Sequence, residues 1–294
     1  SLHSLDPRIR LALANSLWAA QRAPLKPGFS SRNRLHYQAE IANVDFGDSA
    51  TCGRINSWVK EQTQNKIDNL VKPEDCTPDT LLMLLDAIYF KGAWSDPFDP
   101  GATRPGPFTL ANGKRKQVSM MRRSGRQTYF EDRSLQAVSI PYGQGDITFD
   151  ILLPKEGGRL VKMLEEIDVK SWDKTISRLT ETNIDLGLPR WKLEEEAELN
   201  RPLPDLGMKL AFTGKADFSD MTDEQAMISV VRHKSYLEVN EEGTEATAAT
   251  AVTMVRMAAF YARPVINVDH PFLCAIRHKP TGLLLFLGLV NDPG

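Results

Sequence analysis

The stretch Glu241-Glu-Gly-Thr-Glu-Ala-Thr-Ala-Ala-Thr-Ala-Val-Thr-Met-Val-Arg-Met-Ala258 decides how the chain is interpreted. It follows a strand-like run, Ser235–Asn240, and Glu242-Gly243 favours a turn. After Gly243 come small residues with no Pro and no further Gly, whereas surface loops are usually rich in Gly, Pro, Asn and Asp. The stretch therefore combines the position of a loop with the composition of a strand.

The residues of this stretch alternate with the period of two that is typical of a strand. One face is small or apolar throughout: Thr244, Ala246, Ala248, Thr250, Val252 and Met254. A strand with such a face fits between two existing strands without clashing. An Ala-rich helix is the alternative, because Ala is the best helix former. The interspersed Thr and Val residues disfavour that helix.

The overall composition is that of an ordinary soluble globular protein, with 41% apolar and 25% charged residues in a chain of 294. This length allows one large domain or two small ones. The net charge of −2 argues against a nucleic-acid or membrane partner. The longest apolar run, Leu283–Val290, is shorter than the ~18 residues that a membrane helix needs.

The sequence contains no recognisable catalytic or metal-binding motif. It lacks the Gly-x-Ser-x-Gly, His-Glu-x-x-His and P-loop patterns, and its five histidines have no ligand spacing. Cys52, Cys76 and Cys274 have neither the number of a disulfide framework nor the spacing of a zinc site. We therefore expect no enzyme activity, no metal and no cofactor.

Apolar patterning predicts many strands and a few helices, an α+β composition. The expected strands are Ile9–Trp18, Ala42–Phe46, Thr80–Phe90, Phe108–Met121, Leu135–Tyr142, Ile151–Pro154, Ile184–Trp191, Ile228–His233, Val265–Val268, His270–Ile276 and Leu283–Pro293. The expected helices are Phe29–Ile41, Leu160–Ile167, Lys170–Leu179 and Leu199–Phe212, and the stretch Arg54–Val71 is expected to hold an amphipathic helix followed by a break.

Three further stretches have a distinct character. Thr80–Phe90 is apolar on both faces, which places it in the middle of a sheet covered on both sides. The basic residues Lys114–Lys116, Arg122, Arg123 and Arg126 are expected in a solvated loop, with a polyanion site as the alternative. Glu194–Glu198 is expected to be a solvated acidic segment.

Taken together, these stretches resemble the serpin family. The family's hinge pattern is matched by Glu241, Glu242, Gly243, Thr244, Glu245, Ala246, Thr247, Ala248 and Ala249. Further matches are Ile55-Asn-Ser-Trp-Val59 with Thr63 and Lys66-Ile67, Ala87-Ile-Tyr-Phe-Lys-Gly-Ala-Trp94, Leu206-Gly-Met208, Pro271-Phe272 and Leu285-Phe-Leu-Gly288.

The resemblance implies a single domain over residues 1–294 that begins partway into the family fold, without its N-terminal helices. It implies a large mixed central sheet, smaller sheets with packed helices, and an exposed reactive-centre loop at residues 241–264. It also implies a monomer and, from the family alone, favours an extracellular location.

The resemblance further implies an inhibitor that acts as a suicide substrate. A target serine protease, or alternatively a cysteine protease, attacks one bond of the loop and forms an acyl-enzyme. The freed segment then inserts into the main sheet, beginning with Thr244. Inserting ~10 residues adds about ten backbone hydrogen bonds of ~1 kcal/mol each, so the native state is expected to be metastable. A non-inhibitory serpin, such as a carrier or chaperone, and a fragmentary serpin are the alternatives.

The resemblance also implies the scissile bond, because serpins keep a nearly fixed distance from the hinge to this bond: counted from Gly243, it is Met257–Ala258, which suits proteases with an apolar pocket. The bond Arg256–Met257 is the alternative and suits trypsin-like proteases.

The family's sheet-opening region is matched by Asp86, Trp94 and His233. Asp86 stands where the family has Asn, and a carboxylate in an apolar run is costly unless it is paired. We expect either a partly buried Asp86–His233 ion pair that holds the sheet closed, or an Asp86 that is solvated through the gap left by a missing helix.

Overall fold

A computed structural model describes residues 6–155, 160–244 and 263–294. The chain clusters into two compact units: unit 1 contains residues 1–10, 91–192 and 238–294, and unit 2 contains residues 11–90 and 193–237. The predicted fold class is confirmed, because mixed sheets are combined with α-helices. The single domain stays a prediction.

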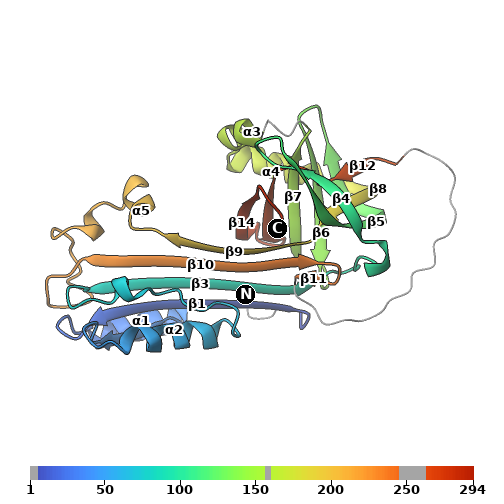
Figure 1. Cartoon of the computed structure of the whole chain (residues 1–294). Coiled ribbons are helices and arrows are strands. Elements are labelled where there is room, and N and C mark those ends of the chain that lie inside the picture. The colour runs from blue at the N-terminus through green and yellow to red at the C-terminus, as the bar shows by residue number, and fades with distance from the viewer. Residues whose placement is uncertain (1–5, 156–159, 245–262) are drawn as a thin grey trace. The chain divides into compact units, whose positions relative to one another are not determined.

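Unit 2 is built on a sheet in which strands β2, β1, β3, β10 and β9 follow one another in that order, and Figure 1 shows β1, β3, β10 and β9 side by side. The strands are β1 (Ile9–Ala20), β2 (Glu40–Val44), β3 (Leu82–Ala93), β9 (Trp191–Glu198) and β10 (Ile228–Asn240). The helices are α1 (Pro27–Tyr37), α2 (Thr51–Gln62) and α5 (Pro202–Asp205), with short 3-10 turns at Pro73–Asp75 and Leu210–Phe212. Strands β3 and β10 are parallel partners from Leu82↔Ile228 to Tyr89↔Tyr236.

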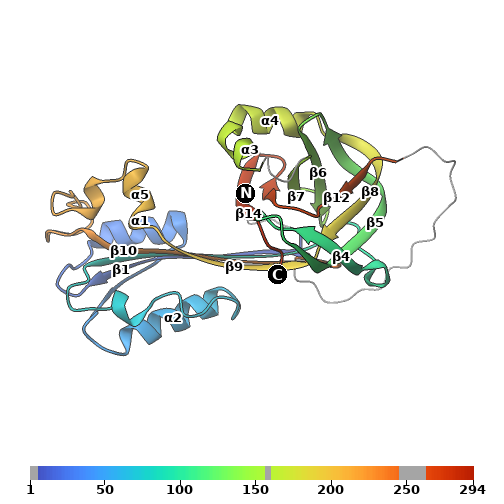
Figure 2. The same ribbon diagram turned by 45° about the horizontal axis from the view of Figure 1, so that its top comes forward.

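Helix α2 lies along one face of this sheet, as Figures 1 and 2 show. Its buried Ile55 and Val59 pack against Trp18 of β1 and against Tyr89 and Tyr236, which lie on neighbouring strands. This cluster accounts for one set of apolar residues in β3, and Leu82 belongs to a second cluster with Ala19, Met221 and Ala226, so the strand is apolar on both faces.

Unit 1 contains a sheet in which β12, β8, β5, β6, β7, β13 and β14 follow one another, with β4 paired to β5. The strands are β4 (Arg104–Thr109), β5 (Arg115–Glu131), β6 (Leu135–Tyr142), β7 (Ile147–Pro154), β8 (Thr180–Pro189), β12 (Val265–Asn267), β13 (Phe272–His278) and β14 (Leu283–Val290). Helices α3 (Leu160–Glu166) and α4 (Val169–Ser177) cover part of it, and a 3-10 turn lies at Pro100–Ala102. The core here includes Trp172 of α4, packed with Leu152 and Leu273.

Two helix predictions need correction. The helix predicted over Leu199–Phe212 is wrong: only α5 and a 3-10 turn form, because Pro202 and Pro204 lack backbone donors and Gly207 has a φ of +111°. The helix predicted from Phe29 ends at Tyr37, and Ile41 lies in strand β2.

The charged stretches are also more structured than expected. Most of the basic cluster lies in strand β5, not in a solvated loop, and the Arg123 guanidinium lies 4.5 Å from the Phe98 ring centre. The acidic segment lies in strand β9, where Glu194 pairs with Lys234 at 3.0 Å. Arg123 and Glu194 thus have specific partners that the sequence pattern does not reveal.

The cysteines differ from expectation as well. Cys52 and Cys76 form a disulfide with a Cα–Cα distance of 6.1 Å, and Cys274 is free and buried. Two cysteines that are 24 residues apart give no spacing signal in the sequence, so only the fold brings them together.

Candidate functional site

The base of the predicted loop is already part of a sheet. Gly243 and Thr244 form the short strand β11, which pairs with Ala93 and Gly92 of β3 on one side and with residues 239–240 of β10 on the other. Thr244 is completely buried. The expectation that Thr244 enters the sheet only after cleavage is therefore corrected.

Gly243 allows this close approach. Its φ is +143°, a conformation that residues with side chains rarely adopt. A Cβ atom at this position would lie 2.1 Å from the carbonyl oxygen of Gly92 and 2.7 Å from the Cα of Ala93. The hinge pattern needs glycine here because the neighbouring backbone leaves no room.

Trp94 holds the hinge through both its backbone and its ring. Its backbone N–H donates to the Glu242 carbonyl at 3.0 Å, and its indole N–H donates to the Asn240 carbonyl at 2.9 Å. The indole stacks on Tyr142 with ring centres 4.3 Å apart. Trp94, predicted for the sheet-opening region, thus contacts the segment that leads into the loop.

The Tyr142 hydroxyl shares a hydrogen bond of 2.7 Å with the Thr244 hydroxyl. Burial raises the pKa of Tyr142 well above its ordinary value, although the hydrogen bond to Thr244 opposes this. The phenol is therefore neutral at physiological pH, and β11 is anchored by a neutral hydrogen bond in the core of unit 1.

Glu241 is fixed by two side chains. Its carboxylate accepts a hydrogen bond of 2.7 Å from the Thr103 hydroxyl and pairs with the Arg190 guanidinium at 2.5 Å, while its carbonyl accepts from the Phe98 N–H at 2.8 Å. Burial alone would raise the pKa of Glu241, but these hydrogen bonds outweigh it and lower the pKa. In the described part of the chain, Oε2 of the adjacent Glu242 is buried without a hydrogen-bond partner.

Asp86 and His233 occupy paired positions on β3 and β10 in unit 2. The His233 Nδ1 lies 2.5 Å from the Asp86 Oδ1. Their side chains are 36% and 45% exposed, respectively. The two side chains are in contact and half exposed to solvent, whereas the role of this contact in holding the sheet closed stays a prediction.

Three contact residues were missed from the sequence. Thr103, Tyr142 and Arg190 each touch the hinge, yet they lie between 51 and 138 residues away from their partners in the chain. None of them belongs to a sequence motif. Only Tyr142, at the end of an apolar strand, could have been inferred from the sequence to be buried.

Several predicted site residues lie outside the described residues. These are the hinge residues Glu245, Ala246, Thr247, Ala248 and Ala249, and the candidate scissile residues Arg256, Met257 and Ala258.

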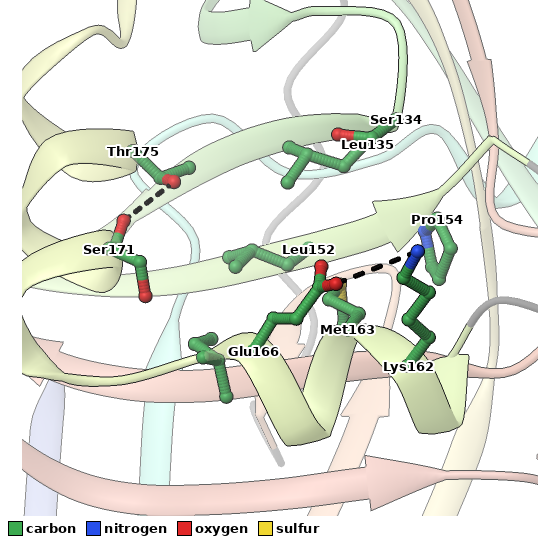
Figure 3. Close-up of a pocket in the computed structure, with 10 residues that line it drawn as sticks. Ser134, Leu135, Leu152, Pro154, Lys162, Met163, Glu166, Ser171 and Thr175 are labelled. Carbon is green, nitrogen blue, oxygen red and sulfur yellow. Dashed lines mark hydrogen bonds and ion pairs between the residues drawn. The ribbon is translucent and has the colours of Figure 1, made fainter.

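A pocket of about 210 Å³ lies beneath α3 and α4 in unit 1 (Figure 3). Its floor is apolar, with Leu135, Leu152 and Met163. The polar groups at its rim are already used: Lys162 pairs with Glu166 at 3.6 Å, and the hydroxyls bond to neighbouring backbone or side chains. None of the hinge residues that the structure describes, 241–244, lines it.

Among residues 6–155, 160–244 and 263–294, no cluster of potential metal ligands is found. No helix in this part of the chain combines the length and the apolar character that a membrane crossing requires.

Comparisons with known proteins agree with the geometry. Residues 1–293 match the family model described as "Serpin (serine protease inhibitor)". The leukocyte elastase inhibitor of Homo sapiens is 38% identical over 96% of this chain and 78% of its own length.

Two solved structures have the same fold. Serpin48 of the insect Tenebrio molitor, described as a highly specific serpin, matches with a TM-score of 0.89 and 30% identity over 100% of this chain and 79% of its own. Human thyroxine-binding globulin in complex with thyroxine matches with a TM-score of 0.90 and 28% identity over 99% of this chain and 77% of its own. The chain spans about three quarters of the length of these relatives.

Proposed function

Because the chain belongs to the serpin family, we propose that it inhibits a protease as a suicide substrate, by cleavage and insertion of its loop. The observation that carries this proposal is strand β11, whose two residues pair with strands on both sides. In the period-two pattern, Ala246 and Ala248 are the next residues that share a face with Thr244, and they are small, so the same strand can lengthen once β3 and β10 separate.

Extension of β11 supplies the free energy that drives insertion of the cleaved loop. Each added residue lies between two strands and gains backbone hydrogen bonds worth ~1 kcal/mol net each. Insertion of ~10 residues therefore releases an amount comparable with the stability of a whole domain, ~5–15 kcal/mol. An intact loop withholds this gain, because its far end stays attached to the chain that leads to β12.

The proposed scissile bond is Met257–Ala258, with Arg256–Met257 as the alternative. The first suits an elastase-like or chymotrypsin-like serine protease and the second a trypsin-like one. The similarity to a leukocyte elastase inhibitor supports the apolar choice. A cysteine protease can form the equivalent acyl-enzyme.

The test is incubation with elastase and with trypsin. We expect a complex that survives SDS, and a released C-terminal peptide that begins at Ala258 with elastase. A peptide that begins at Met257 would assign the bond to Arg256 instead. Cleavage by both proteases without any complex would overturn the inhibitory proposal.

The variant Thr244→Arg tests whether β11 is needed for trapping, because Thr244 already lies in the sheet of the intact chain. It places a charge at a fully buried position, so we expect cleavage as a substrate without trapping. Thr180→Arg, at an exposed threonine of β8, is the matched control and should still trap the protease. Equal trapping by both variants would show that β11 is not needed for trapping and would contradict the proposed extension of this strand.

The alternative function is that of a non-inhibitory carrier. The likeness to thyroxine-binding globulin favours it. The pocket beneath α3 and α4 argues against it, because ~300–1,000 Å³ is usual for ligand sites and this one has about 210 Å³. The absence of any SDS-stable complex in the protease experiment would favour this alternative.

A further inference from the structure

The segment that follows α2 forms a strap over the sheet of unit 2. The strap, residues 63–76, buries Ile67, Leu70 and Val71 in the core. Asn56 of α2 holds it with two hydrogen bonds of 2.8 Å to the backbone of Val71. The strap therefore folds back along the helix and belongs to the same packed layer.

Charged groups tie the strap to strand β10. Asp75 accepts hydrogen bonds of 2.7 and 3.1 Å from the Arg232 guanidinium, and both side chains are only 7% exposed. Lys234 donates to the backbone carbonyl of Asp68 at 3.0 Å. A charge pair this buried is costly to break unless another partner takes over.

Such a partner is present on strand β9. Glu198 and Glu196 lie 3.3 and 3.7 Å from Nη1 of Arg232. If Asp75 moved away, Arg232 would keep acidic neighbours. The strap can therefore release β10 without leaving an isolated buried charge.

The strap spans the seam between β3 and β10. It continues in the chain into β3 at Leu82, while its side chains hold β10. Its end is fixed by the disulfide from Cys76, which adjoins Asp75, to Cys52 in the first turn of α2. Both cysteines are only partly buried, so an external thiol can reach them.

We propose that the Cys52–Cys76 disulfide is a redox lock on the strap, which low-molecular-weight thiols open. A thiolate attacks one sulfur, the S–S bond breaks, and the other cysteine leaves as a thiolate. A second thiol resolves the mixed disulfide, so two thiol molecules are oxidised to a disulfide while Cys52 and Cys76 are reduced. The remaining cysteine, Cys274, takes no part, because burial raises its pKa to about 12.

Opening the lock has two consequences. The strap loosens and strands β9 and β10 become more dynamic, independently of any protease. If the inhibitory function proposed above holds, the β3–β10 seam also separates faster, since β11 must lengthen between those strands. Only this second consequence rests on the proposed function.

The experiment is native hydrogen exchange of the full chain, with and without dithiothreitol. Thiol alkylation followed by mass spectrometry first establishes the state of Cys52 and Cys76. We expect reduction to speed exchange at least tenfold in peptides covering 63–76 and 228–236, consistent with a disulfide that closes a loop of this size. Peptides from β6 and β7 in unit 1 should not change.

The double variant Cys52→Ser/Cys76→Ser is the matched control. Without thiol, this variant should already show fast hydrogen exchange in residues 63–76 and 228–236. Addition of thiol should not change its exchange further. If this variant does not fold, the reduced wild-type protein carries the test alone. The proposal is overturned if the purified protein lacks the disulfide, if the disulfide resists thiol in the native state, or if reduction leaves exchange of the strap unchanged.

Protease trapping is measured on the same samples. Faster exchange together with a changed stoichiometry of trapping supports both proposals. Faster exchange without trapping in either redox state contradicts only the inhibitory function, whereas normal trapping with unchanged exchange contradicts only the lock.

Discussion

Single residues at the hinge have requirements that follow from their immediate neighbours. Gly243 lies against the backbone of β3, and Glu241 is held by Arg190 and Thr103. The first requirement is steric and the second electrostatic. Different substitutions therefore test them separately.

Replacement of Gly243 by Ala should expel β11 from the sheet. The added Cβ would meet backbone atoms at 2.1 Å, which cannot move aside as a flexible side chain can. We expect a loss of about 1–3 kcal/mol in the free energy of unfolding, from the lost pairing of β11, measured by urea denaturation. Hydrogen exchange should rise at residues 92–94.

Gly125→Ala is the matched control for this prediction. Gly125 has a similar φ of +151°, but nothing lies within 4 Å of its Cβ position. If both variants lose the same stability, backbone strain and not the contact with β3 explains the requirement for glycine at position 243.

Glu241 should make stability depend on pH on the acid side. Its pKa is lowered in the folded state, so its contribution is present above the unfolded value of about 4.5 and is lost as pH falls through the lower folded value. Glu241→Gln should cost about 1–3 kcal/mol at neutral pH and flatten the urea stability profile below pH 4.5. Glu181→Gln, at an exposed position, should do neither. If the stability of Glu241→Gln falls below pH 4.5 as steeply as that of the wild type, Glu241 does not cause the acid dependence.

At the scale of elements, two strand contacts differ in strength because they differ in burial. The contact between β11 and the end of β6, through Thr244 and Tyr142, is fully buried. The contact between β3 and β10 through Asp86 and His233 is half exposed. The two contacts have similar distances, 2.7 and 2.5 Å, but we expect the buried one to contribute more to the free energy of unfolding.

The Thr244–Tyr142 hydrogen bond should contribute about 0.5–1.5 kcal/mol. A double-mutant cycle with Thr244→Val and Tyr142→Phe measures it, since both changes keep the shape of the side chain and remove a hydroxyl. The two effects on the free energy of unfolding should be clearly non-additive. Additive effects would mean that the hydroxyls do not act together.

When His233 is protonated, the Asp86–His233 contact should contribute only about 0.2–1 kcal/mol, like other solvent-exposed ion pairs. The cycle uses Asp86→Ala and His233→Ala with urea unfolding at low and at high salt. The coupling should shrink at high salt, because the pair is accessible to ions. A coupling of several kcal/mol would show that the pair is a major lock on the sheet.

At the scale of the whole molecule, stability should also fall on the alkaline side. Burial alone would lower the pKa of His270, but the Asp269 carboxylate at 2.8 Å and the Pro154 carbonyl at 2.6 Å raise it. The contribution of His270 is fully present below about 6.5 and is lost as pH rises through the higher folded value. His270→Gln should therefore destabilise the protein most in mildly acid solution.

Urea unfolding from pH 5 to 9 measures this effect. The wild-type curve should lie above that of His270→Gln at pH 5 to 6, and the difference should narrow above neutrality. His36→Gln, at an exposed histidine, should leave the curve unchanged. Parallel curves for His270→Gln and the wild type would show that the His270 charge does not contribute.

The sequence by itself determined the family, the α+β class and most strands. These features are predictable because apolar alternation and motifs such as Ala87–Trp94 are each contained in a short stretch of the chain. It also predicted the hinge and the Asp86–His233 contact. Only the tertiary structure decided that Thr244 lies within a sheet, that Tyr142 and Arg190 hold the hinge, and that Cys52 and Cys76 are joined. These features depend on residues brought together from distant parts of the chain. A hydrogen bond, the burial of a side chain or a disulfide depends on distances between residues that are far apart in the sequence. A short sequence pattern therefore does not predict them.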